Sequence, residues 1–240
     1  MEQNPSDVTH GILYLVSTPI GNLEDITLRA LRVLKEADLI AAEDTRRIKK
    51  LLYHYQIKTP VTSYFEHTTF RKTQSFIAQL KMGKKIALVS EAGTPSISDP
   101  GYKLTTLAIE NQIKVIPIPG VAALIAALSA SGLPTHSMVF EGFIPRTSGK
   151  RRNLFLSLKD QGRTLIFYES PRRLLSTLKD LLEILGDRKI VIAREMTKMF
   201  EEMIRGKTSE VITRLENKAV RGEITIVVSG KPPSSKGHLG

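Results

Sequence analysis

Short, continuous apolar segments alternate with amphipathic segments along most of this chain. The segments at 12–17 (ILYLVS) and 85–90 (KIALVS) are apolar at nearly every position, and Leu28, Leu31 and Leu34 recur between them at helical spacing. Strands of this composition are usually buried on both faces, as in a parallel sheet covered by helices. The alternation therefore predicts an α/β fold, with a mostly parallel sheet in the first half.

The predicted elements follow one another closely. In the first half we expect strands at 12–17, 38–42, 61–65, 85–90 and 114–118, and helices at 27–37, 45–55, 71–81, 101–111 and 121–131. In the second half we expect strands at 139–143, 164–168, 190–194, 203–207 and 223–229, and helices at 150–158, 171–185 and 209–218. Antiparallel neighbours among the last strands would make this second sheet mixed.

A stop signal divides the chain into two domains. Gly132-Leu133-Pro134 ends the helix at 121–131, so we expect an N-terminal α/β domain at 11–134 and a C-terminal α/β domain at 135–230. The last residues, SGKPPSSKGHLG, are polar and rich in Pro, Gly and Ser. We expect segments 1–10 and 231–240 to be disordered.

The chain is strongly basic, with 35 Lys and Arg against 24 Asp and Glu, and a net charge of +11. Residues 1–117 carry 15 basic and 12 acidic side chains (15 − 12 = +3), whereas residues 118–240 carry 20 and 12 (20 − 12 = +8). Such an excess favours a polyanionic partner such as RNA. The alternative is that the charges only keep the protein in solution.

Basic residues gather in three clusters that are candidate contacts for RNA phosphates, although a charge cluster can also be no more than a solvated face. The clusters are Arg46, Arg47, Lys49 and Lys50; Arg146, Lys150, Arg151 and Arg152; and Arg172 and Arg173. Aromatic residues make up only 6% of the chain and Trp is absent, which disfavours an extended platform for base stacking. We therefore expect recognition of RNA by shape.

Some classes of protein are excluded by what the chain lacks. It has no cysteine, which excludes disulfides, zinc–thiolate sites and iron–sulfur clusters, and its five histidines have no metal-ligand spacing. We therefore expect no metal. The first residues, MEQNPSDVTHG, do not resemble a signal peptide, and the longest nearly apolar stretch, 121–133, is too short to span a bilayer. We expect a soluble, cytoplasmic protein that does not enter membranes.

Three loops are richer in Gly, Pro and small residues than simple connections require. They are 18–23 (TPIGNL), 91–101 (EAGTPSISDPG) and 117–123 (PIPGVAA). All three follow predicted parallel strands, and ligands of open α/β sheets bind at the carboxyl ends of strands. Each loop alone could be only a tight turn, but together they indicate a ligand held by backbone groups. The glycine patterns of dinucleotide and P-loop sites are absent.

Several long motifs resemble the tetrapyrrole methylase-like superfamily. They are LYLVSTPIGNLEDITLRAL, VSEAGTPSISDPGY, IPGVAALIAALSASGLP, FEGFIPR and TLIFYESPRRL, and the resemblance extends over 11–229. Within this superfamily the motifs are most similar to the branch that methylates a cytidine ribose 2′-hydroxyl in small-subunit (16S) ribosomal RNA. The resemblance implies two α/β domains, S-adenosylmethionine bound in the cleft between them, a homodimer, and ribosomal RNA, within the assembled subunit, as the substrate.

The resemblance also implies which residues contact the methyl donor. They are Ile20 in the first loop; Glu91, Ala92, Gly93 and Thr94 in the second; Pro119, Gly120, Ala122 and Ala123 in the third; and Phe167 and Tyr168 in the second domain, with further contacts near 222–223. Three positions depart from the family pattern. Glu91 replaces an aspartate and Val121-Ala122 replaces Pro-Ser, so details of the expected donor contacts differ here. Arg172 replaces a histidine, which weakens any family role assigned to that position.

A ribose hydroxyl is a weak acid, so its methylation benefits from a general base or from a cation that stabilises the developing alkoxide. Carboxylate–cation pairs follow two predicted strands, at Asp44 with Arg46 and at Glu195 with Lys198. We expect Glu195 or Asp44 to act as base, with Arg46 and Lys198 orienting phosphate or stabilising the oxyanion. The alternative is that both pairs are ordinary surface ion pairs.

Two other functions remain open at this point. One is C-methylation of a tetrapyrrole, a corrinoid or sirohaem precursor, by the same fold with the same donor. The other is a non-catalytic RNA-binding factor in ribosome assembly. The forms STPIGNLEDIT and EAGTPSISDPG favour the RNA branch of the resemblance over the tetrapyrrole branch.

Overall fold

The computed structural model describes residues 10–65 and 68–232 and consists of two compact units, Met1–Ala122 and Ala123–Gly240. The division precedes helix α5 (Ala123–Ser131), whereas the predicted boundary at residue 134 follows it. The difference arises because α5 packs against strands of the second unit. Of the two segments predicted to be disordered, residues 1–9 and 233–240 lie outside the described residues.

The five-stranded sheet of the first unit is parallel throughout, in the order β3-β2-β4-β1-β5. Its strands are β1 (Ile12–Val16), β2 (Leu39–Ala42), β3 (Val61–Ser63), β4 (Lys85–Val89) and β5 (Lys114–Ile118). Leu13 of β1 lies opposite Ile86 of β4 on one side and Val115 of β5 on the other. The predicted parallel sheet is confirmed, and the carboxyl ends of β4, β1 and β5 lie side by side.

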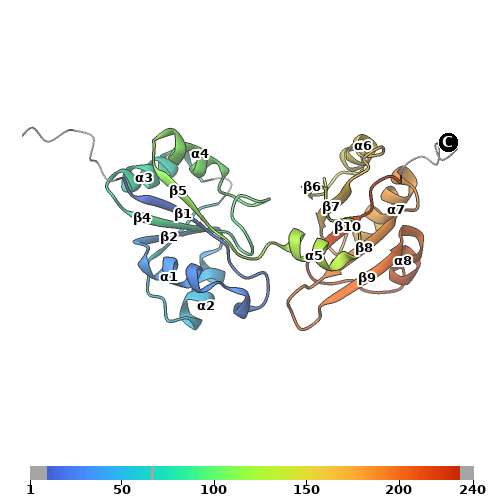
Figure 1. The fold of residues 1–240 in the computed structure, drawn as a ribbon, viewed down its shortest axis with the longest axis horizontal. Helices are drawn as coiled ribbons and strands as arrows, with labels where there is room; N and C mark the ends of the chain where they lie inside the picture. The colour runs from blue at the N-terminus through green and yellow to red at the C-terminus, as the bar shows by residue number, and fades with distance from the viewer. Residues whose placement is uncertain (1–9, 66–67, 233–240) are drawn as a thin grey trace, which may run out of the picture. The chain divides into compact units, whose positions relative to one another are not determined.

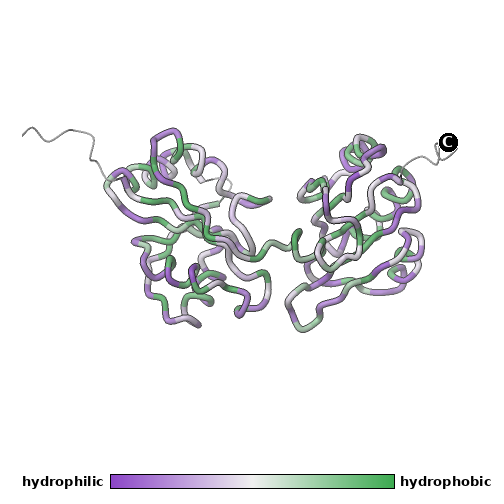
Figure 2. The backbone as a smooth tube through the Cα atoms, in the orientation of Figure 1, coloured by the Kyte–Doolittle hydropathy of each residue, from purple (hydrophilic) through white to green (hydrophobic). Residues whose placement is uncertain are grey.

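Two helices cover each face of this sheet (Figure 1). α1 (Leu28–Glu36) and α2 (Thr45–His54) pack on one face, and α3 (Phe70–Lys81) and α4 (Tyr102–Glu110) pack on the other. The side chains of β4 alternate between the two cores, with Ala87 and Val89 in one and Ile86 and Leu88 in the other. A strand buried on both faces has to be apolar throughout, and Figure 2 shows hydrophobic stretches along the strands.

A short 3₁₀ helix, η1 (Leu23–Asp25), follows the first predicted ligand loop and was not expected from the sequence. Asn22 begins it, because its side-chain Oδ1 accepts a hydrogen bond of 3.1 Å from the backbone N–H of Glu24. The hydroxyl of Tyr55 donates to the carbonyl of Leu23 at 2.8 Å and fixes η1 near the end of α2.

The five-stranded sheet of the second unit is mixed, as expected, in the order β6-β7-β10-β8-β9. Its strands are β6 (Met138–Phe143), β7 (Thr164–Glu169), β8 (Lys189–Arg194), β9 (Glu202–Lys207) and β10 (Ile224–Val228). β6 is parallel to β7, and β9 is antiparallel to β8. β10 is antiparallel to both its neighbours, β7 and β8, and all of its residues are buried. The last strand of the described residues therefore forms the centre of this sheet.

Helices α6 (Ser148–Ser157), α7 (Leu174–Leu185) and α8 (Thr208–Leu215) form the main core of the second unit with the sheet. α5 contacts β7, β8 and β10 (Figure 1). The guanidinium of Arg205 on β9 donates to the carbonyl of Ala130 at 2.6 Å and holds the end of α5. Within the described residues, no helix is both long and apolar enough to cross a membrane.

Truncation of a side chain at the centre of the second sheet is expected to destabilise this unit strongly. Ile226 on β10 is fully buried, and Ile226→Ala should lower the free energy of unfolding by about 2–5 kcal/mol because it leaves a cavity. Ile125 on α5 is 49% exposed, and Ile125→Ala should cost less than about 1 kcal/mol. Urea unfolding of both variants checks this, and equal losses would contradict the assigned core.

Candidate functional site

The three loops singled out in the sequence extend from adjacent strands of the first unit. Residues 17–22 follow β1, residues 90–101 follow β4, and residues 119–122 follow β5. Because β1 lies between β4 and β5, the structure brings these loops together at one edge of the sheet. This edge is the carboxyl end of a parallel sheet, where ligands of open α/β folds bind.

Hydrogen bonds lock the three loops to one another. Thr18 and Gly93 exchange two backbone hydrogen bonds of 2.9 Å. The hydroxyls of Ser17 and Thr94 lie 3.0 Å apart, and the Thr94 hydroxyl donates to the carbonyl of Val121 at 3.2 Å. Thr94 therefore donates to the third loop while it accepts from Ser17. One hydroxyl links all three segments.

Two glycines at this edge cannot be replaced without strain. Gly93 has a φ of +84°, a left-handed conformation that favours glycine. A Cβ atom on Gly120 would lie 2.7 Å from the Cβ atom of Ser17, which is closer than two carbon atoms can approach. Glycine at 120 therefore permits the first and third loops to pass close to each other.

The residues predicted to bind the donor in these loops offer both apolar and polar groups. Ile20 is buried, and its side chain lies next to Gly93. The hydroxyl of Thr18 is buried without a hydrogen-bond partner in the part of the chain that the structure describes. A buried hydroxyl of this kind is normally satisfied, so a polar ligand atom fits there. Thr18 was not predicted as a donor contact, because nothing in its motif distinguishes it from a turn residue.

A group of carboxylates lies at the same edge. Partial burial, with the negative charges of Glu43 and Glu91, raises the pKa of Asp99 to about 6, although a hydrogen bond with Ser90 acts in the opposite direction. Glu91, which stands where the family has aspartate, forms an ion pair with Arg47 of α2. The predicted donor-binding loop is thus connected to the first basic cluster. Asp99 was not predicted, and its only sequence signal is its place in the second loop.

Asp44 begins α2. Its Oδ1 accepts a hydrogen bond of 2.8 Å from the backbone N–H of Arg46, and the side chains of the two residues form an ion pair of 3.4 Å. The hydrogen bond from the backbone of Arg46, followed by that from its side chain, lowers the pKa of Asp44. The predicted pair therefore exists, and its carboxylate also serves as a helix cap.

In the second unit, Phe167 and Tyr168 have different surroundings because successive side chains of β7 alternate between faces. Phe167 is fully buried against Phe155, with ring centroids 5.9 Å apart, so only its backbone can contact a ligand. The Tyr168 hydroxyl oxygen accepts a hydrogen bond of 3.2 Å from the backbone N–H of Leu124. Tyr168 therefore lies beside Ala123, another residue predicted to contact the donor.

Glu195 and Lys198 form the second predicted pair, with Lys198 Nζ 2.8 Å from Glu195 Oε1. Glu223 completes the group, because its carboxylate lies 3.1 Å from Lys198 Nζ and its backbone N–H donates to Glu195 Oε1 at 2.9 Å. The hydrogen bond from Lys198, then that from the backbone of Glu223, lowers the pKa of Glu195. Burial opposes the charge of Lys198, but hydrogen bonds to the two carboxylates outweigh it and raise the pKa of Lys198.

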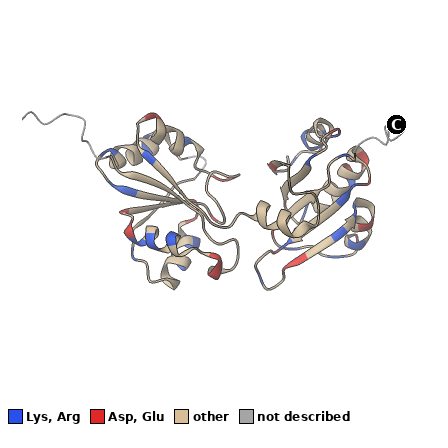
Figure 3. Ribbon diagram, viewed as in Figure 1, with Lys and Arg blue, Asp and Glu red and all other residues tan. Residues whose placement is uncertain are grey.

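Part of the predicted RNA-binding set is already held in ion pairs. Arg151 is buried and lies 2.5 Å from Asp180, which also pairs with Arg152 at 3.0 Å. Arg173 pairs with the buried Glu169. The other members are exposed and, apart from the pairs of Arg46 and Arg47 given above, have no ion pair within residues 10–65 and 68–232: Lys49, Lys50, Arg146, Lys150 and Arg172. Figure 3 shows the basic residues on α2.

No group of three or more His, Asp or Glu side chains in the described residues is arranged to hold a metal ion. The expectation that the protein uses no metal stays a prediction.

Comparisons with known proteins agree on one family. The family described as tetrapyrrole (corrin/porphyrin) methylases matches residues 12–212. A ribosomal RNA small subunit methyltransferase I from Thermotoga maritima is 53% identical over 221 residues, covering 92% of this chain and 99% of the relative. A relative of the same name from Halalkalibacterium halodurans is 53% identical over 220 residues, covering 92% of this chain and 76% of its own. A cobalt precorrin-4 methyltransferase shares the fold, with a TM-score of 0.69 and 16% identity over 91% of this chain and 94% of its own.

The cluster of Glu43, Glu91 and Asp99 predicts a titration that can be measured. Asp99 should titrate near pH 6, and Glu91→Gln should lower its pKa because a neighbouring negative charge is lost. This folded-state pKa lies above the ordinary value of 3.8. Ionisation of Asp99 should therefore lower the free energy of unfolding as the pH rises from 3.8 to about 6. Carboxyl carbon NMR measures the titration, with Glu110→Gln on α4 as the control. An Asp99 pKa near 4, or a Glu91→Gln variant without effect, would contradict the assignment.

Proposed function

This chain belongs to the tetrapyrrole methylase family and is a methyltransferase, and from that premise we propose that it methylates the 2′-hydroxyl of a cytidine in the 16S RNA of the small ribosomal subunit. The observation that carries the proposal is that relatives named for small-subunit ribosomal RNA methylation align over nearly the whole chain. The cytidine and the 2′ position rest on the motif resemblance. We further propose S-adenosylmethionine as the donor, the assembled subunit as the substrate, and a cytoplasmic homodimer as the active form.

The interlocked loops of the first unit fit this donor. Thr18 offers a buried hydroxyl, Ile20 offers an apolar side chain, and the exposed Gly120, which has no Cβ atom, lets a ligand approach the backbone. The other donor contacts proposed are Glu91, Ala92, Thr94, Pro119, Ala122, Ala123 and Tyr168, with Phe167 through its backbone. When bound, S-adenosylmethionine supplies a methyl group on a positively charged sulfur. The loops would hold that group in line with the attacking oxygen, and such positioning contributes much of the rate in a methyl transfer.

Lys198 is suited to stabilise negative charge on the ribose oxygen. Its pKa is raised by Glu195 and Glu223, so its ammonium remains charged at neutral pH. A carboxylate whose pKa is lowered is a weak base, and Glu195 fits better as the residue that positions Lys198. Asp44 with Arg46 is the second candidate for base and phosphate contact, in addition to capping α2.

The exposed basic residues fit an RNA substrate. Arg46, Lys49 and Lys50 lie on α2, and Arg146, Lys150 and Arg172 lie in the second unit, so each is available to a phosphate. We propose that these residues make the main phosphate contacts. Arg47, Arg151, Arg152 and Arg173 would contribute only to the extent that their ion pairs leave donors accessible.

Transfer of a labelled methyl group tests the proposed function. Small ribosomal subunits that lack their own modifications are incubated with the protein and methyl-labelled S-adenosylmethionine, then digested to nucleosides, with a tetrapyrrole precursor in a parallel reaction. Label in 2′-O-methylcytidine is expected. Label only in the tetrapyrrole would replace the proposal with C-methylation. Failure to bind the donor, with no transfer to either, would favour a non-catalytic role in ribosome assembly, and donor binding without transfer would point to another substrate.

Closing the gap between the first and third loops should weaken donor binding. Gly120→Ala puts a Cβ atom against Ser17 and displaces the third loop, so we expect the donor Kd to rise about tenfold, equivalent to ~1.4 kcal/mol. Gly149→Ala on α6 is the matched control, since its added Cβ meets nothing within 4 Å. Titration calorimetry with S-adenosylmethionine measures both. An unchanged Kd for Gly120→Ala would remove the third loop from the donor site.

Loss of the Lys198 ammonium should slow methyl transfer without weakening the donor complex. We expect Lys198→Met to lower kcat by about 10²–10³-fold, the usual cost of losing one group that stabilises an oxyanion. Glu195→Gln should lower kcat less, because Glu223 still holds Lys198. Lys179→Met, which removes an exposed cation paired with Glu216, is the control. If Lys198→Met has the same kcat as the unaltered protein, the Glu195–Lys198 pair has only a structural role.

A further inference from the structure

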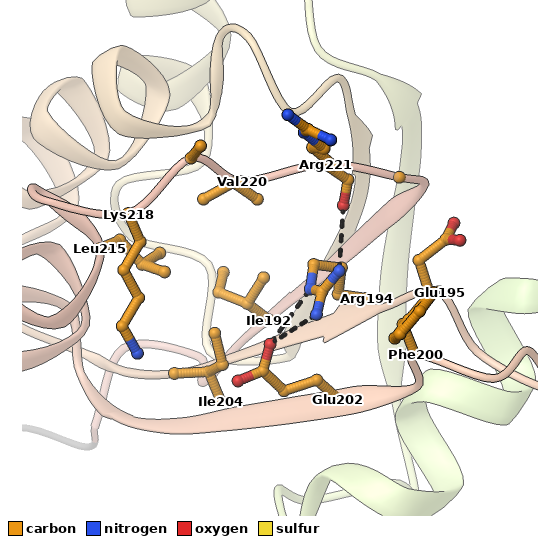
Figure 4. Close-up of a pocket in the computed structure, with 12 residues that line it drawn as sticks. Ile192, Arg194, Glu195, Phe200, Glu202, Ile204, Leu215, Lys218, Val220 and Arg221 are labelled. Carbon is orange, nitrogen blue, oxygen red and sulfur yellow. Dashed lines mark hydrogen bonds and ion pairs between the residues drawn. The ribbon is translucent and has the colours of Figure 1, made fainter.

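The second unit contains a pocket of whose lining residues only Glu195 and Gly222 also belong to the donor and catalytic groups described above. Its volume is about 350 Å³, within the range of small-ligand sites. The floor is apolar, with Ile192 of β8, Ile204 of β9, Leu215 at the end of α8, and Val220 of the loop that follows (Figure 4). The pocket exists because α8 ends at Leu215 and leaves the last part of β8 and the first part of β9 uncovered.

The rim of this pocket carries an excess of positive charge. Arg194 and Glu202 pair at 3.0 Å and neutralise each other. Lys198 is shared by Glu195 and Glu223, which leaves one negative charge in that group of three. Lys218 and Arg221 are exposed, and their side chains have no ion pair or hydrogen bond in the part of the chain that the structure describes. Two available cations therefore stand above an apolar floor.

An exposed aromatic ring forms another side of the pocket. Phe200 is 67% exposed, and Figure 4 places it and Lys218 on opposite sides of the Arg194–Glu202 pair. It belongs to the loop between β8 and β9, in which Glu195 and Thr197 have φ values of +51° and +67°. Such conformations persist only where neighbouring contacts hold them. Because these contacts fix the loop, the ring of Phe200 stays exposed to solvent, although exposing an apolar ring to water is unfavourable.

We propose that this pocket binds one unpaired nucleotide of the RNA substrate, with its base against Phe200 and the apolar floor and its phosphates at Lys218 and Arg221. The inference rests on the proposed function, since it names a second contact for the same RNA. Proteins that bind single-stranded RNA without reading its sequence use an apolar surface, aromatic rings and unpaired cations, and this pocket offers all three. The net charge of +8 in residues 118–240 favours an anionic occupant over a neutral one.

A single pocket of this kind is compatible with the low aromatic content of the chain. Base stacking needs only one exposed ring per base, so a single nucleotide can be held where an extended stacking platform is absent. The nucleotide would fix the RNA while the target ribose reacts elsewhere. The pocket is therefore expected to affect RNA affinity and KM, and to leave donor affinity unchanged.

Binding of a labelled single-stranded RNA of about ten nucleotides and mixed sequence tests the pocket. Two changes separate the contribution of stacking from that of charge.

Phe200→Ala should raise the Kd at least fivefold without changing its salt dependence. The double variant Lys218→Ala with Arg221→Ala should raise the Kd about tenfold and make binding less dependent on salt. Lys159→Ala with Arg163→Ala removes the same charge at the opposite end of the sheet and should change the Kd less than threefold.

The outcomes separate this inference from the proposed function, because methyl transfer to small subunits is measured on the same proteins. If the unaltered chain transfers methyl groups but Phe200→Ala has no effect on Kd or KM, or the two charge variants behave alike, the pocket does not bind the RNA. If the unaltered chain does not bind the short RNA, the inference also fails. A change in self-association with unchanged RNA affinity would make the pocket an interface between copies. Absence of methyl transfer by the unaltered chain would instead count against the proposed function.

Discussion

The order β4-β1-β5 in a parallel sheet is the constraint on which the first unit depends. Three loops that are far apart in the sequence leave the sheet at one edge, where Ser17, Thr94 and Val121 come within hydrogen-bond distance. Because Thr94 both accepts and donates, no loop can move without breaking a bond to another. Gly93 takes up the left-handed conformation within this frame, and Gly120 leaves exposed backbone beside it. A site that positions a reactive methyl group requires such a rigid frame.

In the second unit, antiparallel pairing brings the candidate residues together. β10 enters the centre of the sheet, so the residue before it, Glu223, lies beside Glu195 at the end of β8. The two carboxylates hold Lys198 charged, and the hydrogen bond from Glu223 supports the positive φ of Glu195. Positive φ values of this kind cost about 1–3 kcal/mol each, which the surrounding contacts have to offset. The same loop carries Phe200, so the fixed Lys198 and the exposed ring depend on one set of contacts.

The alternation of apolar and amphipathic segments was sufficient to predict the type and position of the main elements, and β5 occupies its predicted range at 114–118. Pairings in space could not be predicted. A mostly apolar strand such as β7 does not reveal that Phe167 faces the core while Tyr168 faces α5. A basic cluster does not reveal that Arg151 will form an ion pair with Asp180. α5 was assigned to the first unit because its stop signal is strong, but the packing of a helix on a sheet is not a local property.

A crystal structure of the protein with S-adenosylhomocysteine, the demethylated donor, tests the central claim most directly, because that claim is that the locked loops form the donor site. The account predicts the molecule against Ile20, with the Thr18 hydroxyl and backbone groups of residues 92–94 and 119–123 within hydrogen-bond distance of it. A molecule bound away from these loops, or one that breaks the Ser17–Thr94 bond on binding, would contradict it.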